Sequence, residues 1–217
     1  MRRQLEKQPL VLVSPLTGDG ITHLPDPPDR MPNEILSLGI DPGVTGAWAL
    51  VGLNTASAEY RLVAYGDIPV IEYKRSHRTR RRIDTHGFIK DIRDPARMAD
   101  VICTEIVFAP PGISSTVAFS LGMSASSVWA AIDALPANAK KKHVEVAPRS
   151  WKTHFKLGQD KPASVDLAAH LFGEPVRNHC WSRVKDHNRA EAALIAVWAA
   201  VSCPQIVSRS PHYKAAL

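Results

Sequence analysis

The sequence predicts an α/β fold built on a mixed five-stranded sheet that helices flank. Three observations predict this fold class. An apolar strand pattern ends at Asp41, two further strand patterns follow it closely, and the rest of the chain alternates helical stripes with short apolar strands. The chain of 217 residues is long enough to bury a full core within one domain.

The first three strands are expected to form an antiparallel meander. Residues 34–41 have the pattern of a buried strand that Asp-Pro-Gly ends, and residues 46–53 provide its partner after a tight turn. Residues 59–70 contain the third strand. The remaining two strands must therefore come from the second part of the chain.

Helices and strands alternate in that second part. Residues 83–98 show a partial helical stripe with Asp84 as a plausible cap, and residues 99–108 form the next buried strand. A long helix over residues 115–135 begins at a Ser-Ser-Thr cap. The last elements expected are a strand within 141–148, a helix over 161–172 and an almost wholly apolar helix over 188–201.

Composition divides the chain into three segments. Residues 1–34 are rich in proline and lack periodicity, so we expect an extended or disordered N-terminal tail. Residues 35–203 carry the predicted domain, and residues 204–217 form a C-terminal tail.

Charge and cysteine content indicate which kind of partner and which redox compartment suit the protein. The formal charge of +6 and the pI near 9.4 fit a polyanionic partner without demanding one. Cys103, Cys180 and Cys203 are widely spaced, so neither a disulfide framework nor a zinc site is indicated, and a reducing compartment is expected.

No membrane association is expected, because no apolar run reaches the ~18 residues of a membrane span. The N-terminus lacks a clear signal peptide, which favours a cytoplasmic protein. An organellar presequence stays open because Arg2, Arg3 and Lys7 are present, although Glu6 weakens it.

Four acidic residues stand in apolar surroundings: Asp41, Glu105, Asp186 and Glu191. Each taken singly is as well explained by a cap or a surface position. Clustered carboxylates repel one another unless a hard cation neutralises them, and Mg²⁺ is the usual one. Two such ions about 4 Å apart activate a water and stabilise the departing oxygen of a phosphodiester. The set therefore favours nucleic-acid hydrolysis.

Four blocks make the sequence similar to a known family. "LGIDPGVTGAWALV", "ADVICTEIVF", "VAPRSWKTHFKLGQDK" and "KDHNRAEAALIAVWAA" together resemble the RuvC-type Holliday junction resolvases, most closely their phage and prophage branch. The resemblance covers roughly residues 36 to 201. It implies a ribonuclease-H-like fold, two Mg²⁺ ions per site with Mn²⁺ as a substitute, a homodimer, branched DNA such as a four-way junction as substrate, and a bacterial or phage-encoded, nucleoid-associated enzyme.

Some of the family's metal ligands have clear counterparts in this sequence, and others do not. Asp41 matches the ligand of the first strand and Glu105 that of the fourth. The family closes the site with two ligands three positions apart on the final helix, but the residue three before Glu191 is Asn188, a poor Mg²⁺ ligand.

Two residues compete to complete the set. Asp186 lies five positions before Glu191, about 140° away on a continuous helix, so it converges only if it lies outside the regular turn. His187 lies four before Glu191, shares its helical face and could act on the water or the leaving group. A solvated residue at the helix start explains His187 equally well.

Two lysines match family positions that neutralise the scissile phosphate. They are Lys152 and Lys161, and the alternative for both is an exposed lysine with no role. An ammonium beside a phosphoryl oxygen stabilises the charge that grows in the transition state.

The densest run of charge is expected to grip DNA phosphates. Its members are Lys74, Arg75, Arg78, Arg80, Arg81 and Arg82. A solvated loop is the alternative, and phosphate binding would give a steep salt dependence without sequence preference. Phe108 matches the family's wedge or stacking aromatic at the junction centre, with a buried strand end as its alternative.

The helix over residues 117–135 is the candidate dimer contact through Met123, Val128, Trp129 and Ile132, and packing on the sheet explains it equally well.

Two other functions compete with the nuclease. A catalytically decayed DNA-binding protein of the same fold is supported by Asn188. An ATP-using kinase or ATPase of the actin-like fold is favoured only by "GIDPGVTG" and lacks room for a duplicated half.

Overall fold

The structure, a computed structural model, describes residues 30–75, 77–140, 143–158, 161–182 and 186–203. Most of the predicted N-terminal tail and all of the C-terminal tail lie outside the described residues. The strands are β1 (Glu34–Asp41), β2 (Ala47–Asn54), β3 (Glu59–Asp67), β4 (Val70–Arg75), β5 (Arg78–Ile83), β6 (Val101–Glu105) and β7 (His143–Val146). The helices are α1 (Thr85–Met98), α2 (Ser115–Asp133), α3 (Ala137–Lys140), α4 (Pro148–His154), α5 (Lys161–Phe172), α6 (Glu174–Cys180) and α7 (His187–Ser202).

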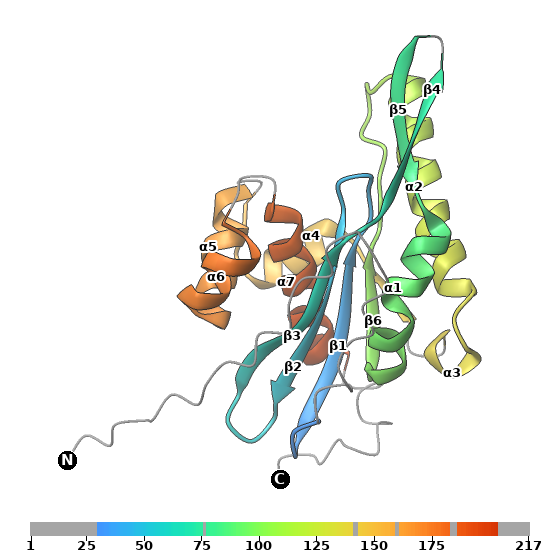
Figure 1. Ribbon diagram of the computed structural model, residues 1–217. Helices are drawn as coiled ribbons and strands as arrows, with labels where there is room; N and C mark the ends of the chain where they lie inside the picture. The colour runs from blue at the N-terminus through green and yellow to red at the C-terminus, as the bar shows by residue number, and fades with distance from the viewer. Residues whose placement is uncertain (1–29, 76, 141–142, 159–160, 183–185, 204–217) are drawn as a thin grey trace, which may run out of the picture.

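Five strands form one mixed sheet in the order β3-β2-β1-β6-β7 (Figure 1). The strands β1, β2 and β3 pair antiparallel, whereas β6 pairs parallel with both β1 and β7. The meander plus two parallel strands confirms the predicted α/β fold with a mixed five-stranded sheet. The parallel part brings the carboxyl ends of β1, β6 and β7 to one edge of the sheet.

A tight turn joins β1 to β2 just after Asp41. The Gly46 N–H donates to the Gly43 carbonyl at 3.0 Å, and a side chain on Gly46 would collide with the Asp41 carbonyl oxygen. Only glycine allows this close return of the chain. The turn therefore holds the chain after Asp41 in one compact path.

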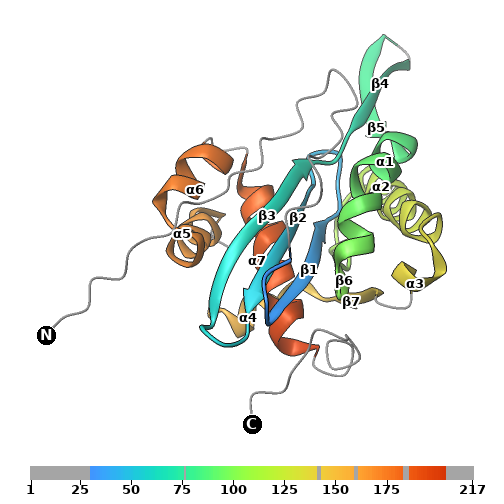
Figure 2. The ribbon, with the colours of Figure 1, turned by 60° about the horizontal axis from the view of Figure 1, so that its bottom comes forward.

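Helices cover both faces of the sheet (Figure 2). One face packs against α7 in a core cluster that includes Ile35, Val51 and Cys103. The other face packs against α1 and α2, with Ile40 and Phe88 in a second cluster. Alternate residues of β1 point to opposite faces, so Asp41 lies on the same face as Ile35, the α7 face.

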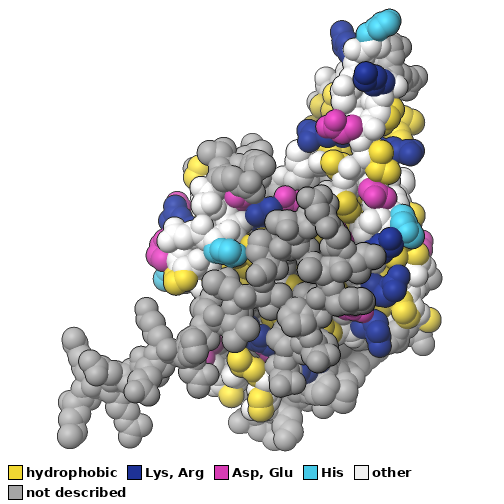
Figure 3. Space-filling model, viewed as in Figure 1, with side chains coloured by type: hydrophobic (Ala, Val, Ile, Leu, Met, Phe, Trp, Pro, Cys, Tyr) yellow, Lys and Arg dark blue, Asp and Glu magenta, His cyan; other side chains and the backbone are white. Residues whose placement is uncertain are grey.

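The basic run forms an antiparallel hairpin of β4 and β5, and not the irregular loop that was the alternative interpretation. Figure 1 shows this hairpin projecting beyond the main sheet beside α2, and Figure 3 shows Lys and Arg side chains along it. Its base is closed by the Asp84 N–H, which donates to the Pro69 carbonyl at 2.8 Å. Asp84 then caps α1 by accepting from the Gly87 N–H, as predicted.

The helix α2 is long and apolar enough, by length and composition alone, to cross a membrane. The expectation that no segment reaches this limit is therefore wrong, although soluble helices pass the same test. Ser114 caps the helix by accepting from the Val117 N–H. Val128 and Ile132 are buried in the second core cluster, whereas most of the helix surface is exposed.

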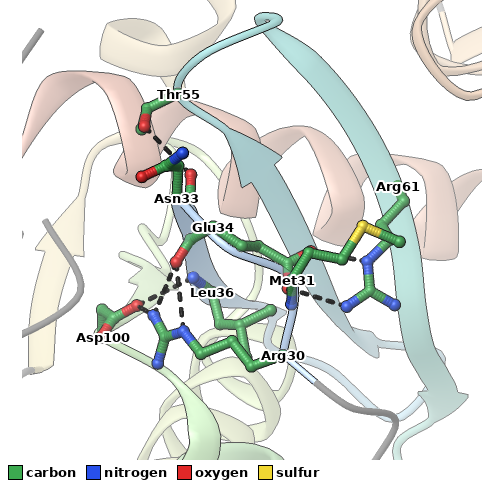
Figure 4. Close-up of polar contacts among 8 residues, drawn as sticks. All are labelled: Arg30, Met31, Asn33, Glu34, Leu36, Thr55, Arg61 and Asp100. Atoms are coloured by element: carbon green, nitrogen blue, oxygen red, sulfur yellow. Dashed lines mark hydrogen bonds and ion pairs between the residues drawn. The ribbon is translucent and has the colours of Figure 1, made fainter. Parts of the chain in front are cut away.

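A polar network fixes the amino-terminal end of β1 (Figure 4). The Glu34 carboxylate accepts two hydrogen bonds from the Arg61 guanidinium, at 2.6 and 2.8 Å. Arg30 donates to the Glu34 carbonyl and forms an ion pair with Asp100, which also accepts from the Leu36 N–H at 2.9 Å. These paired charges compensate the burial of Glu34 and Asp100.

Replacing Gly39 by alanine should destabilise the protein by about 3 kcal/mol, because overpacking at a rigid contact is costly. An added Cβ would overlap the Ala192 carbonyl oxygen and lie 2.5 Å from the Ala196 nitrogen, both in the backbone of α7. Urea unfolding measures the change. Gly122→Ala in α2 is the control, because its Cβ meets nothing within 4 Å, and it should stabilise by about 0.5–1 kcal/mol. Equal effects of the two substitutions would contradict the close contact of α7 with β1.

Candidate active site at the carboxyl edge of the sheet

Asp41 and Glu105 end two neighbouring parallel strands. The last registered pair of β1 and β6 is Ile40 and Thr104, so both acidic residues lie one position further along their strands. Neighbouring strands are about 4.8 Å apart, and residues in register point to the same face. Both carboxylates therefore lie on the α7 face at the same edge.

The short helix α4 brings two more side chains to this edge. Glu105 is in register with Val146 of β7, and α4 begins at Pro148, directly after that strand. The buried Trp151 donates its indole N–H to Glu105 Oε2 at 2.6 Å. The Lys152 ammonium lies 5.0 Å from the centre of the Trp151 ring.

Glu191 of α7 joins the same group. Its Oε1 accepts from Lys152 Nζ at 3.0 Å and from the hydroxyl of Ser164 in α5 at 3.1 Å. Both the Glu191 and Lys152 side chains are largely buried, so this ion pair is better shielded from solvent than an exposed one. Glu105, Glu191 and Lys152 are thus brought together as the sequence predicts.

The surroundings of Glu105 disfavour the ionised form of its carboxyl group beside the charge of Glu191. Burial raises the pKa of the Glu105 carboxyl, and the charge of Glu191 raises it further, while the Trp151 hydrogen bond and the Lys152 charge lower it. The net pKa is above the usual value. Two carboxylates that repel in a buried setting are the arrangement that a cation stabilises.

Asn188 lies beside the turn that follows Asp41. Its side-chain amide donates to the Thr45 carbonyl, so it ties α7 to the β1–β2 turn. Asn188 therefore has a structural contact with the backbone of this turn.

Asp186 is in contact with Arg189. It precedes α7 as the N-cap residue, is buried, and its Oδ1 lies 3.7 Å from Arg189 Nη1. Arg189 also binds Asp67 of β3 through two hydrogen bonds of 2.6 and 2.7 Å and lies over the Tyr65 ring. Asp186 is therefore outside the regular helix, as its use as a ligand requires, but it lies toward β3. Its role as a ligand stays a prediction.

Three other predicted residues have different surroundings. His187 is the first residue of α7 and is partly exposed. Phe108 is 60 % exposed in the loop after β6, so it is not a buried strand end. Lys161 begins α5, but its side chain lies outside what the structure describes.

The basic hairpin borders a groove of about 840 Å³ beside the Asp41 turn. Hairpin, turn and helix α2 all line this groove, through residues that include Thr45, Tyr73, Arg80, Arg82, Ser120 and Met123. The side chains of Lys74, Arg78, Arg80, Arg81 and Arg82 are exposed, whereas that of Arg75 is not described. Three arginines of β5 and the carboxylates of Glu72 and Asp84 line the groove, which reaches the turn that follows Asp41.

The donor set fits a divalent cation bound by few protein ligands. Among the described residues, no group of three or more His, Cys, Asp and Glu side chains is gathered closely enough to hold a metal ion. Mg²⁺ commonly takes only one or two carboxylates and keeps several waters. Glu105 and Glu191, with Asp41 on the adjacent strand end, supply hard oxygen donors of that kind.

Sequence reasoning missed the roles of Trp151, Ser164 and Arg189. Trp151 gave no signal beyond its place next to Lys152 in the sequence. Ser164 and Arg189 gave no local signal, because their partners, Glu191 and Asp67, lie far away along the chain.

Comparisons with known proteins found similar solved structures but no match by sequence. No protein-family model matches the chain, and no curated protein matches it. Among solved structures, T. thermophilus RuvC in complex with Holliday junction substrate is similar, at 14% sequence identity and a TM-score of 0.46, over 79% of this chain and 96% of that chain.

Replacing Glu105 by glutamine should stabilise the metal-free protein at pH 7.5. The raised pKa means that the folded state disfavours the carboxylate more than the unfolded state does, so ionised Glu105 lowers the free energy of unfolding. The advantage of glutamine should shrink as the pH falls toward 4.5, the ordinary value, because folded Glu105 then becomes neutral. Urea unfolding across this pH range, with exposed Glu145→Gln as control, measures both effects. A less stable Glu105→Gln protein at pH 7.5 would show that Trp151 and Lys152 outweigh burial.

Proposed function

We propose that this protein is a divalent-metal-dependent endonuclease that cuts branched DNA, four-way junctions among its substrates. The observation that carries the proposal is the group of Glu105, Glu191 and Lys152 beside Asp41 at the carboxyl edge of the sheet. A basic hairpin and a groove adjoin this edge. The sequence blocks that resemble the RuvC-type resolvases support the same reading.

Each charged residue has a distinct part in the proposed reaction. Asp41, Glu105 and Glu191 would hold Mg²⁺, with Mn²⁺ as a substitute and Asp186 as a further ligand. When bound, the metal supplies an activated water and stabilises the departing oxygen. Lys152 would place an ammonium beside the phosphate whose charge grows, and His187, the first residue of α7, would move a proton.

DNA binding is assigned to the hairpin and to the loop after β6. Exposed arginines of β5 face phosphates across the groove, and Tyr73 offers a ring on the same surface. Phe108 is exposed beyond Glu105, where an aromatic side chain can wedge between bases. Lys161 is proposed as a further phosphate contact.

A homodimer would match the two-fold symmetry of a four-way junction. The helix α2 offers its contact surface through apolar side chains that the fold leaves exposed: Val117, Phe119, Met123 and Trp129. The earlier candidates Val128 and Ile132 pack into the core and are not available for it.

The second candidate is a branched-DNA-binding protein of the same fold that has lost catalysis. Asn188 favours it, because an amide tied to the Thr45 carbonyl stands where the family pattern has a ligand. This protein would bind junctions through the same hairpin without cutting them.

Cleavage of a synthetic four-way junction in Mg²⁺ separates the two candidates. The wild-type protein should cut it, and Asp41→Asn or Glu105→Gln should slow single-turnover cleavage by about 100-fold or more, as removal of an electrostatic group from an active site does. All three proteins should bind the junction equally in a gel-shift assay. If none of them cuts while all bind, the endonuclease proposal fails and the binding protein stands.

Removing two hairpin charges should weaken DNA binding in a salt-dependent way. Arg80→Gln combined with Arg82→Gln should reduce the slope of log K against log salt by about 2, because each lost phosphate contact accounts for about 1. Arg97→Gln is the matched control, since Arg97 is equally exposed but pairs with Asp94 on α1. An unchanged slope in the hairpin variant would remove the hairpin from the DNA interface.

A further inference from the structure

The buried indole of Trp151 makes a direct contact with a candidate metal ligand. Its side chain is fully buried, and its Nε1 donates to Glu105 Oε2 at 2.6 Å. A hydrogen bond to a charged acceptor is stronger than one between neutral groups. Because the large ring has no room to turn, it fixes the direction of the Glu105 carboxylate.

This contact is not a general property of buried tryptophans in the chain. Trp48 and Trp181 are also buried, yet their indole nitrogens have no hydrogen-bond partner among the described residues. Burial of the ring therefore does not by itself provide a partner for the N–H. The position of Trp151 in α4, directly after β7, is what aims its N–H at Glu105.

The second carboxylate of the pair is held in the same way. Ser164 is 1% exposed and donates its hydroxyl to Glu191 Oε1 at 3.1 Å. Trp151 and Ser164 come from different helices, α4 and α5, and each donates to one oxygen of one carboxylate. A neutral donor orients a carboxylate without cancelling its charge, so the carboxylate keeps its attraction for a cation.

We propose that Trp151 and Ser164 are positioning residues that orient Glu105 and Glu191 for a divalent cation. The inference rests on the proposed metal-dependent function. Outer donors of this kind keep metal ligands in one rotamer, and their loss commonly lowers metal affinity or activity by about 10- to 100-fold. Lys152 differs from them, because its positive charge competes with the cation for Glu191.

Metal affinity tests the proposal without relying on cleavage. Mn²⁺ binding, measured by electron paramagnetic resonance or calorimetry, should weaken about 10- to 100-fold in Trp151→Phe, which keeps an aromatic ring but loses the N–H. Trp48→Phe is the matched control, because it alters an equally buried ring whose N–H has no described partner. Its Mn²⁺ affinity should stay at the wild-type value.

Further variants keep the test decisive if Trp151→Phe fails to fold. Incorporation of benzothienylalanine at position 151 retains the ring shape and removes only the donor, and it should weaken Mn²⁺ binding to the same extent. Ser164→Ala should weaken binding about 10-fold, and Ser164→Thr, which keeps the hydroxyl, should restore it. In a Glu105→Gln background, loss of the Trp151 donor should have no further effect on Mn²⁺ affinity.

The outcomes separate the two proposals. If the wild-type protein binds Mn²⁺ and the folded donor-deficient variants bind it equally well, the positioning role is wrong and the metal-dependent function stands. If the wild-type protein binds no Mn²⁺ at millimolar concentration, the metal-dependent function is wrong and the positioning role fails with it.

Discussion

The close approach of α7 to β1 is the constraint on which the rest of the site depends. Gly39 has no side chain, so the backbone of α7 at Ala192 and Ala196 lies directly against the strand. That contact fixes the distance of α7 from the sheet. The helix in turn carries Asn188 and Glu191 toward the carboxyl end of β1. A larger residue at position 39 would move the helix outward, and the carboxylate of Glu191 would move with it.

The buried carboxylates at the two ends of β1 are compensated to different extents. At the amino-terminal end, Glu34 is neutralised within the chain by a two-point contact with Arg61, which makes that end a purely structural anchor. At the carboxyl-terminal edge, Glu105 and Glu191 share Lys152 as a nearby cation, and the pKa of Glu105 is raised. Residual repulsion is the usual sign of a working site, because stability is given up where a charged ligand must bind.

Local pattern explains what could be predicted from the sequence. The meander followed from short-range strand patterns and the Asp-Pro-Gly turn, and Asp41 and Glu105 followed because parallel neighbours end at one edge. The hairpin was missed because four of the six residues of β5 are arginines and the strand lacks the alternation that marks a strand. Ser164 and Trp151 were missed because hydrogen bonds between elements far apart along the chain leave no periodic trace. Asp186 lies toward β3 because Arg189 contacts both Asp186 and Asp67 of β3.

The closed base of the hairpin makes the arm separable from the domain. Because the Asp84 N–H already bonds to the Pro69 carbonyl at 2.8 Å, the chain could pass from one residue to the other through a short turn if the arm were removed. The cap of α1 would be kept, whereas the arm includes Ile83 of the second core cluster. Under the proposed function, changes in the length or charge of the arm beyond Ile83 alter DNA affinity and leave the carboxylates at the sheet edge in place, so that affinity and catalysis diversify as independent traits.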